Sequence, residues 1–499
     1  MKSKIKLLLV ILTIFISSCT SIFQQSILSD LWGSEGELWS ADSRLPDFSH
    51  AGLSKRKYNN DLEKQLLDVT DFGAVGDGIT DSTEAFKSAI SAVEKGVVFI
   101  PEGRYVISDV ITISKSNIEL RGAGLEKTIL LFPHSLTEIK GPLKISGYDY
   151  SVYSFGRGIL QVSGKQSSHF ITKINKNALR GDKVLAVDNA AQFKVGQFVR
   201  LTMGNPVELG QYLHDGQNAG EDTLVEFDNL VDTVLKIVEV GDKYVVIDRP
   251  LRTDVDTNWS PSLNTFHSSV SNVGITNLAI EFPNVAKKEH LKEDGYNAIV
   301  FNDVTDTWVK NVKITNADNA LSLFGVRFCE IDHIVLNSDR KQEITGHHGL
   351  WAKSGTQGCV LSDFLINTKF VHDLTVEGLA HGNVFKNGQG LALNFDHHRN
   401  APYENLFSNI YVGSPERIWR SSGNRTRGPH SGVRTTFWNL HFKDKNLSKI
   451  PDWPQLNYIG LSNQPDSKSE SGKWLENTKW LFPEELHEAQ RNANISKRH

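Results

Sequence analysis

Five short apolar runs in the second half of the chain constrain its fold more than any other feature. They begin 22, 29, 24 and 17 residues apart, and each is followed by a second strand-like run. Repeated strand–turn–strand units of this length indicate a solenoid whose coils stack and bury a continuous core. The unequal steps favour a parallel β-helix with variable loops over a leucine-rich or propeller repeat. The first runs start at Ala298, Ala320, Gly349, Asp373 and Gly390, and the second runs cover 308–314, 329–336, 359–366, 383–385 and 405–412.

Alignment of the first runs predicts which side chains face the core. In a parallel stack, equivalent residues of successive coils lie about 4.8 Å apart, and alternate residues face opposite sides. The predicted inward columns are Ile299, Leu321, Leu350, Leu374 and Leu391, and Phe301, Leu323, Ala352, Val376 and Leu393. The predicted outward columns are Asn302, Phe324, Lys353, Glu377 and Asn394, and Val300, Ser322, Trp351, Thr375 and Ala392. Taken alone, the Lys353–Glu377 pair is typical of a surface salt bridge worth about 1 kcal/mol or less.

The region before these repeats carries a recognisable set of motifs. The run DFGAVGDGITD at 71–81 precedes apolar residues at helical spacing between 85 and 93. The strand–turn–strand run VVFIPEGRYV at 97–106 and the turn IELRGAG at 118–124 follow in order. This block closely resembles the N-terminal cap and first coils of the pectate-lyase-like superfamily. The resemblance implies a right-handed parallel β-helix with an N-terminal capping helix, but no particular chemistry, because these residues seal the end of the solenoid.

Breaks in the pattern predict six segments. Residues 158–255 interrupt the repeats with strand-like runs typical of antiparallel hairpins, and we expect them to form a small β insertion along one wall of a cleft. The predicted segments are 1–19 (signal peptide), 20–65 (tether and N-terminal segment), 66–157 (cap and first coils), 158–255 (β insertion), 256–445 (main coils with the cleft) and 446–499 (C-terminal polar tail or cap).

The first nineteen residues are typical of a bacterial lipoprotein signal. Three lysines precede the apolar run 7–16, and Ile16-Ser17-Ser18-Cys19 resembles a lipobox, in which the cysteine is acylated. An ordinary signal peptide that happens to contain a cysteine is the alternative. We expect Cys19 to anchor the protein in the bacterial cell envelope, in the outer membrane facing the periplasm or the cell surface.

Charge and composition exclude some classes of partner. With 39% hydrophobic and 22% charged residues, the chain is typical of a soluble globular protein. Its net charge of −4 gives no general attraction for nucleic acid, so an anionic partner must meet a local basic patch. We therefore expect an acidic polysaccharide or oligosaccharide as substrate, the membrane through the lipid anchor, and no nucleic acid.

Histidine and arginine gather in one stretch that predicts the functional cleft. Seven of the seventeen histidines lie between 347 and 430. A solvated surface would mix lysine with glutamate, whereas this stretch collects histidine, arginine and tryptophan. The candidate catalytic residues are His347, His348, Lys353, Glu377, His381, Asp396, His397, His398, Arg399 and Tyr403. The candidate substrate-binding residues are Trp351, Asn394, Arg417, Trp419, Arg420, Arg425, Arg427 and His430.

These residue types suit β-elimination at a uronic acid. A cation neutralises the sugar carboxylate, a histidine or tyrosine removes the C5 proton, and the oxygen on C4 leaves. We expect a histidine of the 397–398 pair or His348 as the base and Tyr403 as the acid. A polysaccharide lyase and a dehydratase of the terminal uronic acid share this chemistry. Ulvan-like algal polymers and animal glycosaminoglycans would suit a basic cleft equally well.

Two other functions remain open on the sequence. A glycoside hydrolase would use Glu377 and Asp396 as its two carboxyl groups, although the motifs of the polygalacturonase relatives are missing. A non-catalytic glycan-binding β-helix is the third alternative. No aspartate cluster of the kind that binds calcium in related lyases is present. Six neighbouring histidines would suit a divalent cation, but no helical pair supports one, so we predict no metal and no other cofactor.

The two remaining cysteines predict the register of the second strands. The runs that start at Cys329 and Cys359 superpose at an offset of thirty residues. We expect the two cysteines to stack on adjacent coils, with Cα atoms about 5 Å apart and within disulfide range.

The lipobox prediction is tested by replacing the acylated residue. Cys19→Ala should move the protein from the membrane fraction to the soluble fraction, because the thiol that carries the lipid is gone. The measurement is fractionation followed by immunoblotting, with Cys359→Ala as the matched control. Unchanged membrane association of Cys19→Ala would contradict the prediction.

Overall fold

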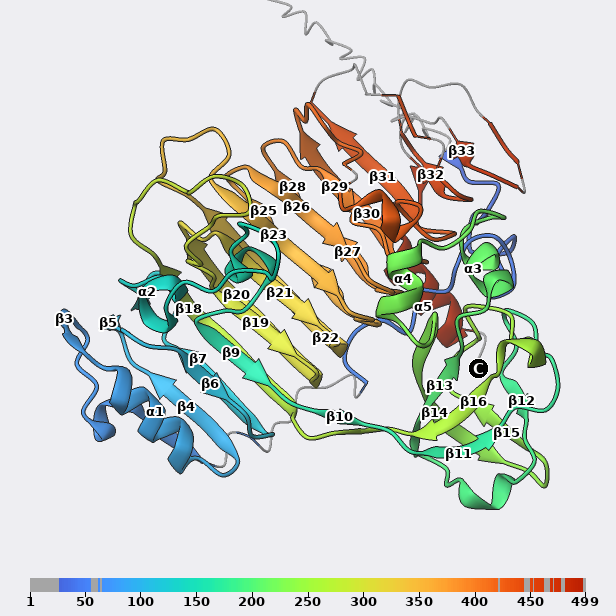
Figure 1. Cartoon of the computed structure of the whole chain (residues 1–499), viewed down its shortest axis with the longest axis horizontal. Helices are drawn as coiled ribbons and strands as arrows, with labels where there is room; N and C mark the ends of the chain where they lie inside the picture. The colour runs from blue at the N-terminus through green and yellow to red at the C-terminus, as the bar shows by residue number, and fades with distance from the viewer. Residues whose placement is uncertain are drawn as a thin grey trace, which may run out of the picture.

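The computed structural model describes residues 27–54, 62, 65–420, 422–443, 449–451, 453–461, 467–469, 471–476 and 481–496. Within these ranges the chain forms a right-handed parallel β-helix with a separate antiparallel insertion (Figure 1). Cys19 and the predicted signal peptide lie outside the described residues. None of the helices in the described ranges has both the length and the apolar character needed to cross a bilayer.

One face of the solenoid is a seven-stranded parallel sheet, which we call the front sheet (Figure 1). Each strand pairs directly with the strand one coil away, so side chains at the same position line up in columns. From one edge to the other its strands are β29 (Phe395–His397), β26 (Phe370–Val376), β23 (Gly346–Lys353), β21 (Asn319–Phe324), β19 (Ile299–Asn302), β9 (Leu160–Ser163) and β6 (Ile111–Ile113).

Longer strands form the other two faces of each coil. β18 (Ser271–Glu281) pairs with β7 (Ile118–Gly122) along its first half and with β8 (Thr128–Leu131) along its second half, so one strand bends across two faces. The same two faces continue through β20 (Thr305–Thr315), β22 (Arg327–Asn337), β24 (Val360–Ser362), β25 (Leu365–Ile366), β27 (Val384–Lys386), β28 (Gln389–Gly390), β30 (Leu406–Gly413), β31 (Thr436–Phe442), β32 (Asn457–Ile459) and β33 (Trp474–Glu476). On the N-terminal side they begin with β2 (Leu66–Asp68), β3 (Asp77–Asp81), β4 (Gly96–Ile100) and β5 (Gly103–Val106).

The bend between those two faces is made by one column of left-handed residues. A short polar side chain tolerates this backbone conformation better than a branched or bulky one. Asn311 donates a hydrogen bond to Asn277 at 2.9 Å, and Asn409 donates one to Asn387 at 3.0 Å. The column therefore fixes the same corner in successive coils. Its members, with φ between 51° and 56°, are Asn277, Asn311, His333, Asp363, Asn387, Asn409 and Asn439.

The predicted register is confirmed for four of the five aligned strands. Ile299, Leu321, Leu350 and Leu374 lie in one buried inward column, and Phe301, Leu323, Ala352 and Val376 lie in the other. Glu330 pairs with Val360, which places Cys329 and Cys359 one above the other on adjacent coils. Both cysteines are buried free thiols, and the predicted distance between their Cα atoms stays a prediction.

The fifth aligned strand is wrong. Leu374 pairs with Phe395, not with Leu391, and Leu391 is 54% exposed. The chain reaches Gln389–Gly390 while it is still on the preceding face, as β28, so the apolar run that follows lies at the corner and not in the front sheet. Asn394 is accordingly not stacked on Lys353 and Glu377. Its side-chain amide donates instead to the buried carboxylate of Asp373.

The insertion is a six-stranded antiparallel sheet with its own core. It differs from the predicted range, because β9 at 160–163 belongs to the front sheet and the last insertion strand ends at Thr265. A thin ribbon of β10 (Gln166–Ser167) and β17 (His267–Ser268) connects it to the coils (Figure 1). Its strands are β11 (Phe170–Lys173), β12 (Val184–Ala186), β13 (Phe198–Met203), β14 (Val231–Val240), β15 (Tyr244–Ile247) and β16 (Ser262–Thr265), and its helices are α3 (Val207–Leu213) and α4 (Glu221–Glu226).

The helices of the first coils and the segments near the ends of the chain complete the architecture. A helix stands where the apolar spacing predicts one, as α1 (Thr83–Ala92), which buries Phe86 and Ile90 against the core. A short helix, α2 (Leu136–Lys140), follows β8 in a long loop.

β1 (Ile27–Leu28) pairs with β34 (Leu481–Phe482) beside α5 (Leu486–Ser496), and the predicted polar tail adds β32 and β33 to the stack.

A buried carboxylate ties the insertion to the coils. Glu404, which is 1% exposed, accepts hydrogen bonds from Arg434 at 2.7 Å, Arg180 at 2.9 Å and Arg252 at 3.2 Å. Arg180 and Arg252 belong to the insertion, and both also donate to carbonyls of the N-terminal segment, at Ser43 and Asp47. Burial alone would raise the pKa of Glu404, but the three guanidinium groups outweigh it and lower the pKa to about 2.

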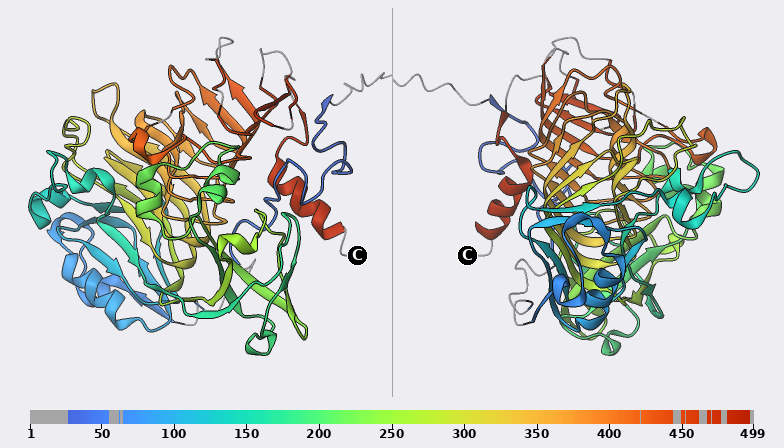
Figure 2. Two further views of the ribbon diagram at one scale, coloured as in Figure 1. Left: turned by 45° about the vertical axis from the view of Figure 1, so that its right-hand side comes forward. Right: turned by 90° about the vertical axis from the view of Figure 1, so that its left-hand side faces the viewer.

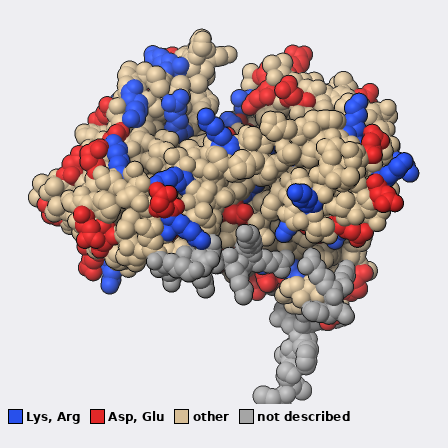
Figure 3. Space-filling model, turned by 90° about the horizontal axis from the view of Figure 1, so that it is seen from below, with Lys and Arg blue, Asp and Glu red and all other residues tan. Residues whose placement is uncertain are grey.

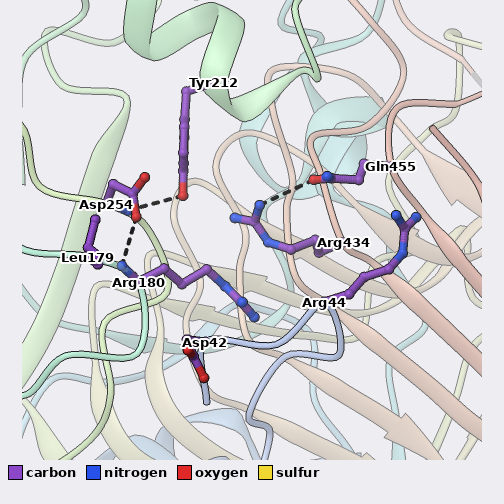
Figure 4. Close-up of a pocket in the computed structure, with 8 residues that line it drawn as sticks. All are labelled: Asp42, Arg44, Leu179, Arg180, Tyr212, Asp254, Arg434 and Gln455. Atoms are coloured by element: carbon purple, nitrogen blue, oxygen red, sulfur yellow. Dashed lines mark hydrogen bonds between the residues drawn. The ribbon is translucent and has the colours of Figure 1, made fainter. Parts of the chain in front are cut away.

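A pocket of about 390 Å³ adjoins this junction (Figure 4). Arg434 points toward Gln455. The backbone N–H of Arg180 donates to the carboxylate of Asp254, and the backbone N–H of Asp254 donates to the hydroxyl of Tyr212. Because these polar groups already have protein partners, the pocket is a structural junction between the insertion and the coils. Its lining residues are Asp42, Arg44, Leu179, Arg180, Tyr212, Asp254, Arg434 and Gln455.

The Glu404 junction predicts a pH dependence of stability. Because the pKa of Glu404 falls on folding from 4.5 to about 2, its contribution to stability is complete above about pH 4.5 and is lost as the pH falls toward 2. Glu404→Gln should unfold at lower urea concentration than the wild type at pH 7, and this difference should shrink between pH 4.5 and pH 2.5. The exposed Glu343→Gln is the matched control. A urea midpoint for Glu404→Gln equal to the wild type at pH 7 would contradict the prediction.

Candidate active site

The site lies on the outward face of the front sheet, in a hollow between two groups of loops. The loop that carries α2 and the insertion project on the same side of the sheet (Figure 2). The space-filling view shows a hollow between these two lobes, with lysine and arginine along its sides (Figure 3). The loop 283–296, which carries His290 and Glu293, and the loop 414–435 bring further side chains to this face.

Two outward columns form the floor of the hollow. Strand pairing places Phe324, Lys353 and Glu377 in one column, and His398 follows Glu377 on the next coil. The neighbouring column contains Ser322, Trp351, Thr375 and Asp396. The predicted stack of Lys353 on Glu377 is therefore confirmed, with His398 in the place predicted for Asn394.

Glu377 is the anion around which the cations of the floor are arranged. Its carboxylate accepts hydrogen bonds from Arg427 at 2.9 Å and from the Trp351 indole at 3.1 Å. Nζ of Lys353 lies 3.4 Å away, and Nδ1 of His398 lies 3.5 Å away. Burial alone would raise the pKa of Glu377, but Lys353, His398 and Arg427 together hold the pKa well below its usual range. The carboxylate is therefore ionised at neutral pH.

Five imidazole rings pack together beside this carboxylate. The His348 ring stacks on Trp351 at 3.7 Å and on His372 at 4.5 Å between ring centroids. His347 lies 4.5 Å from His348, and the ring of His290 lies 4.7 Å from His347. Burial lowers the pKa of His290, His347, His348 and His372, and repulsion between neighbouring imidazoles lowers the pKa of several of them further. These four rings are neutral at pH 7, and His398 is the fifth ring of the cluster.

His398 differs from the other histidines of the cluster. Burial alone would lower its pKa, but the carboxylates of Glu377 and Asp396 outweigh this effect, and the pKa lies above 6.5. Its side chain is 17% exposed, whereas those of His347 and His372 are nearly inaccessible. His398 is therefore the most basic imidazole of the cluster, and it reaches solvent.

Asp396 is fully buried beside His372. Oδ2 of Asp396 lies 3.0 Å from Nδ1 of His372, and Nε of Arg420 donates to the same ring nitrogen at 3.3 Å. Neither carboxylate oxygen of Asp396 receives a well-aligned hydrogen bond from the described residues. Burial alone would raise the pKa of Asp396, but His372, His398 and Arg420 lower it, so this carboxylate is also ionised.

One wall of the hollow depends on contacts between α4 and the loop 414–435. Thr223 in α4 donates to the carbonyl of Arg427 at 2.8 Å, and Thr426 donates to Asp222 at 2.5 Å. Arg399 donates to carbonyls of Gly423 and Gly428 in the same loop. The insertion therefore helps to position Arg427 over Glu377.

The structure brings about half of the predicted site residues together. The floor and cluster contain His347, His348, Trp351, Lys353, Glu377, Asp396, His398, Arg420 and Arg427. Arg399 and His430 contact each other at 3.3 Å and hold the loop 423–430, and Arg425 lies in the 3-10 helix η6 (Arg425–Arg427) of that loop. The pKa of Arg420 is lowered by burial and by the nearby charge of Arg417.

Several predicted site residues lie elsewhere. His397 faces the core, where its ring packs against Trp453 and Phe437. His381 and Tyr403 stack on each other at 4.8 Å, and Tyr403 belongs to the core of the insertion. Trp419 packs against the core residues Phe437 and Tyr458. The prediction that these residues surround the groove is wrong, because His397 occupies an inward position of β29 beside Val376, and the other three lie outside the strands of the front sheet.

Two residues of the cluster were not among the predicted site residues. His372 lies within the histidine-rich stretch, but its run was aligned from Asp373 onward, so its side chain was not assigned to the floor. His290 lies far from that stretch in the sequence, on a loop between β18 and β19. The polar composition of that loop was the only available signal.

Two groups of side chains in the described residues of the hollow could hold a cation. The donor atoms of His290, His347 and His372 all lie within 4.8 Å of one another, and so do those of His372, Asp396 and His398. A third such group, Asp332, His333 and Asp363, lies on the opposite faces of the coils.

Comparisons with known proteins agree with the architecture. Residues 66–202 match the family described as rhamnogalacturonase A/epimerase, pectate lyase-like. Alginate lyase 7 of Azotobacter vinelandii is 34% identical over 109 residues, which cover 20% of this chain and 13% of that protein. Mannuronan C5-epimerase AlgE1 of the same organism is 32% identical over 109 residues, 20% of this chain and 8% of the relative. The chain thus spans about a tenth of the length of these curated relatives.

A solved structure with a similar chain path is the tailspike protein gp49 from Pseudomonas phage LKA1. It has a TM-score of 0.47 and 13% sequence identity over 75% of this chain and 64% of its own. Within the described residues the molecule is a parallel β-helix, and histidine side chains cluster on the outward face of its front sheet. The match of residues 66–202 and the parallel β-helix of the described residues support the predicted resemblance to the pectate-lyase-like superfamily.

The charge arrangement predicts that Glu377 stabilises the floor. Glu377→Gln would leave Lys353 and Arg427 without their counter-charge, while an amide oxygen can still accept from Trp351. We expect a loss of about 3 kcal/mol, at the low end for a broken buried ion pair, because both cations keep partial contact with water. The measurement is urea denaturation followed by circular dichroism, with Glu343→Gln as the control. A loss below about 0.5 kcal/mol would show that the floor does not depend on this carboxylate.

Proposed function

We propose that this protein is a carbon–oxygen lyase that acts by β-elimination on a uronic-acid-containing polysaccharide or oligosaccharide. The observation that carries the proposal is the position of His398, a solvent-reaching imidazole between two ionised carboxylates and surrounded by Lys353, Arg420 and Arg427. The names of the two curated relatives describe reactions of uronic-acid polymers, which supports this class of substrate.

The first role in the mechanism belongs to the cations. A uronate carboxylate bound in the hollow would meet the guanidinium groups of Arg420 and Arg427 and the ammonium of Lys353. Neutralising this carboxylate makes the C5 proton acidic enough to be removed. Arg420 and Arg427 are fixed before substrate arrives, because His372 and Glu377 accept their hydrogen bonds.

The second role belongs to His398. Its free base takes the proton from C5, the C5–H electron pair forms the C4–C5 double bond, and the C4–O bond breaks toward the oxygen. The same imidazole, now protonated, can return the proton to the leaving oxygen, so no separate acid is required. Its contact with Glu377 at 3.5 Å stabilises the imidazolium between these two steps.

The described carboxylates do not favour hydrolysis. A glycoside hydrolase needs one protonated carboxylic acid and one carboxylate. Glu377 and Asp396, the two candidates from the sequence, are both held in the ionised form by cations and imidazoles. Burial raises the pKa of Asp373 to about 7, but this side chain is inaccessible and is bonded to Asn394.

The leaving group at C4 distinguishes the two forms of this proposal. If the leaving oxygen belongs to the next sugar, the protein is a polysaccharide lyase, and if it is a hydroxyl of the terminal uronic acid, the protein is a dehydratase. Acidic algal polymers such as ulvan and animal glycosaminoglycans both offer the required uronate. An anchor at Cys19 would place this reaction at the bacterial cell envelope.

The proposal is tested with a panel of uronic polymers and oligomers. Elimination creates a conjugated double bond that absorbs ultraviolet light, whereas hydrolysis releases reducing ends without this absorbance. We expect His398→Gln to reduce turnover by about 100-fold or more, the contribution of a positioned base. The exposed His169→Gln is the matched control, and circular dichroism checks the fold. Reducing ends without absorbance would replace the proposal with the hydrolase, and full activity of His398→Gln would assign the base elsewhere.

A further inference from the structure

We infer that His290, His347 and His372 form a binding site for a divalent transition-metal ion of the Zn²⁺ type, at the edge of the hollow. The three imidazoles come from different parts of the chain. His290 lies on the loop between β18 and β19, His347 lies in β23, and His372 lies in β26. No repeat or motif requires three histidines at these places, yet the fold brings their donor atoms within 4.8 Å of one another.

The ring geometry fits one shared ion. An ion about 2.0–2.1 Å from each of three ring nitrogens in tetrahedral arrangement places the ring centroids about 5 Å apart. The observed centroid distances are 4.7 Å for His290–His347, 5.3 Å for His347–His372 and 6.1 Å for His290–His372. The longest distance involves the exposed His290, whose side chain can rotate inward without disturbing the core.

Carboxylates stand behind two of the three rings. Nδ1 of His372 lies 3.0 Å from Asp396, and Nδ1 of His347 lies 3.6 Å from Glu293. When Nε2 of His372 binds the ion, Nδ1 carries the proton and donates to Asp396, so Arg420 no longer donates to this nitrogen. Metal-bound histidines commonly direct their other ring nitrogen toward a carboxylate, which orients the ring and makes it a better donor. Both carboxylates are fully buried. Neither carboxylate oxygen of Asp396 accepts a well-aligned hydrogen bond from the described residues, so no backbone N–H group occupies it.

The donor set selects the kind of ion. Three imidazoles suit Zn²⁺, Co²⁺, Ni²⁺ or Cu²⁺, whereas Ca²⁺ and Mg²⁺ require oxygen donors. Three protein ligands also leave one coordination position open, as in catalytic zinc sites.

An open coordination position would suit the proposed substrate. This role rests on the proposed function: a divalent ion at the three histidines would bind the uronate carboxylate and add to the positive charge of Arg420, Arg427 and Lys353. The sequence predicted no metal, because its histidines show no helical pair and His290 lies outside the histidine-rich stretch. The binding site itself does not depend on which reaction the protein catalyses.

The test measures metal binding without reference to activity. The full chain without a histidine tag is treated with a chelator, dialysed, and titrated with Zn²⁺ by calorimetry and with Co²⁺ by its visible d–d absorption. We expect one ion per chain. His290→Ala, His347→Ala and His372→Ala should each weaken binding by at least 100-fold, and Asp396→Asn by about 10- to 100-fold, as for a residue that orients a ligand. His169→Ala should bind as the wild type does.

The outcomes separate the inference from the proposed function. His290 is exposed, so His290→Ala tests the site even if a variant of a buried histidine does not fold. Absence of binding by the wild type, or unchanged affinity of His290→Ala, overturns the inference. Loss of binding in His398→Ala with His290→Ala unaffected also overturns it, because the ion would then lie among His372, Asp396 and His398. Normal binding without any unsaturated product would contradict the proposed function and leave the metal site standing.

Discussion

In-register pairing of parallel coils is the constraint on which the rest of this structure depends. Each residue of the front sheet stands directly over its counterpart on the next coil. A polar residue therefore becomes part of a column whose members lie on strands about 4.8 Å apart. Lys353, Glu377 and His398 meet for this reason, although 45 residues of chain separate the first from the last. The apolar columns on the inner face hold this register, since a slip of one residue would bury the charged column.

The walls of the hollow depend on a second kind of interaction. Glu404 and its three arginines join the insertion, the N-terminal segment and the coils, in addition to the ribbon of β10 and β17 and the hydrogen bonds of β14 and α4 to the coils. A buried ion pair of this kind contributes little net stability compared with apolar packing, but it is strongly disrupted when one partner is lost. Here the Glu404 junction helps to orient the insertion, so that α4 contacts the loop from which Arg427 donates to Glu377.

Charge balance in the hollow explains why imidazoles dominate its chemistry. Glu377 and Asp396 are ionised, and each is surrounded by cations or imidazoles, so neither is available as an acid. Four of the clustered histidines are neutral through burial, and His398 alone is raised by its two carboxylate neighbours. Under the two proposals, His398 would carry the proton, neighbouring imidazoles would hold a metal ion, and Lys353, Arg420 and Arg427 would offer positive charge to an acidic ligand.

The sequence by itself determined the solenoid, the antiparallel insertion and four strands of the front sheet, because apolar periodicity is local and survives in any window of the chain. It also placed Cys329 over Cys359 and Lys353 over Glu377. Only the tertiary structure decided that Asp396 and His398 continue these columns, that His397 and Tyr403 are buried elsewhere, and that His290 joins the histidine cluster. The physical reason is that loops of variable length set where each coil turns its corner. A polar residue on such a loop reaches the site through space, without any regular spacing in the sequence.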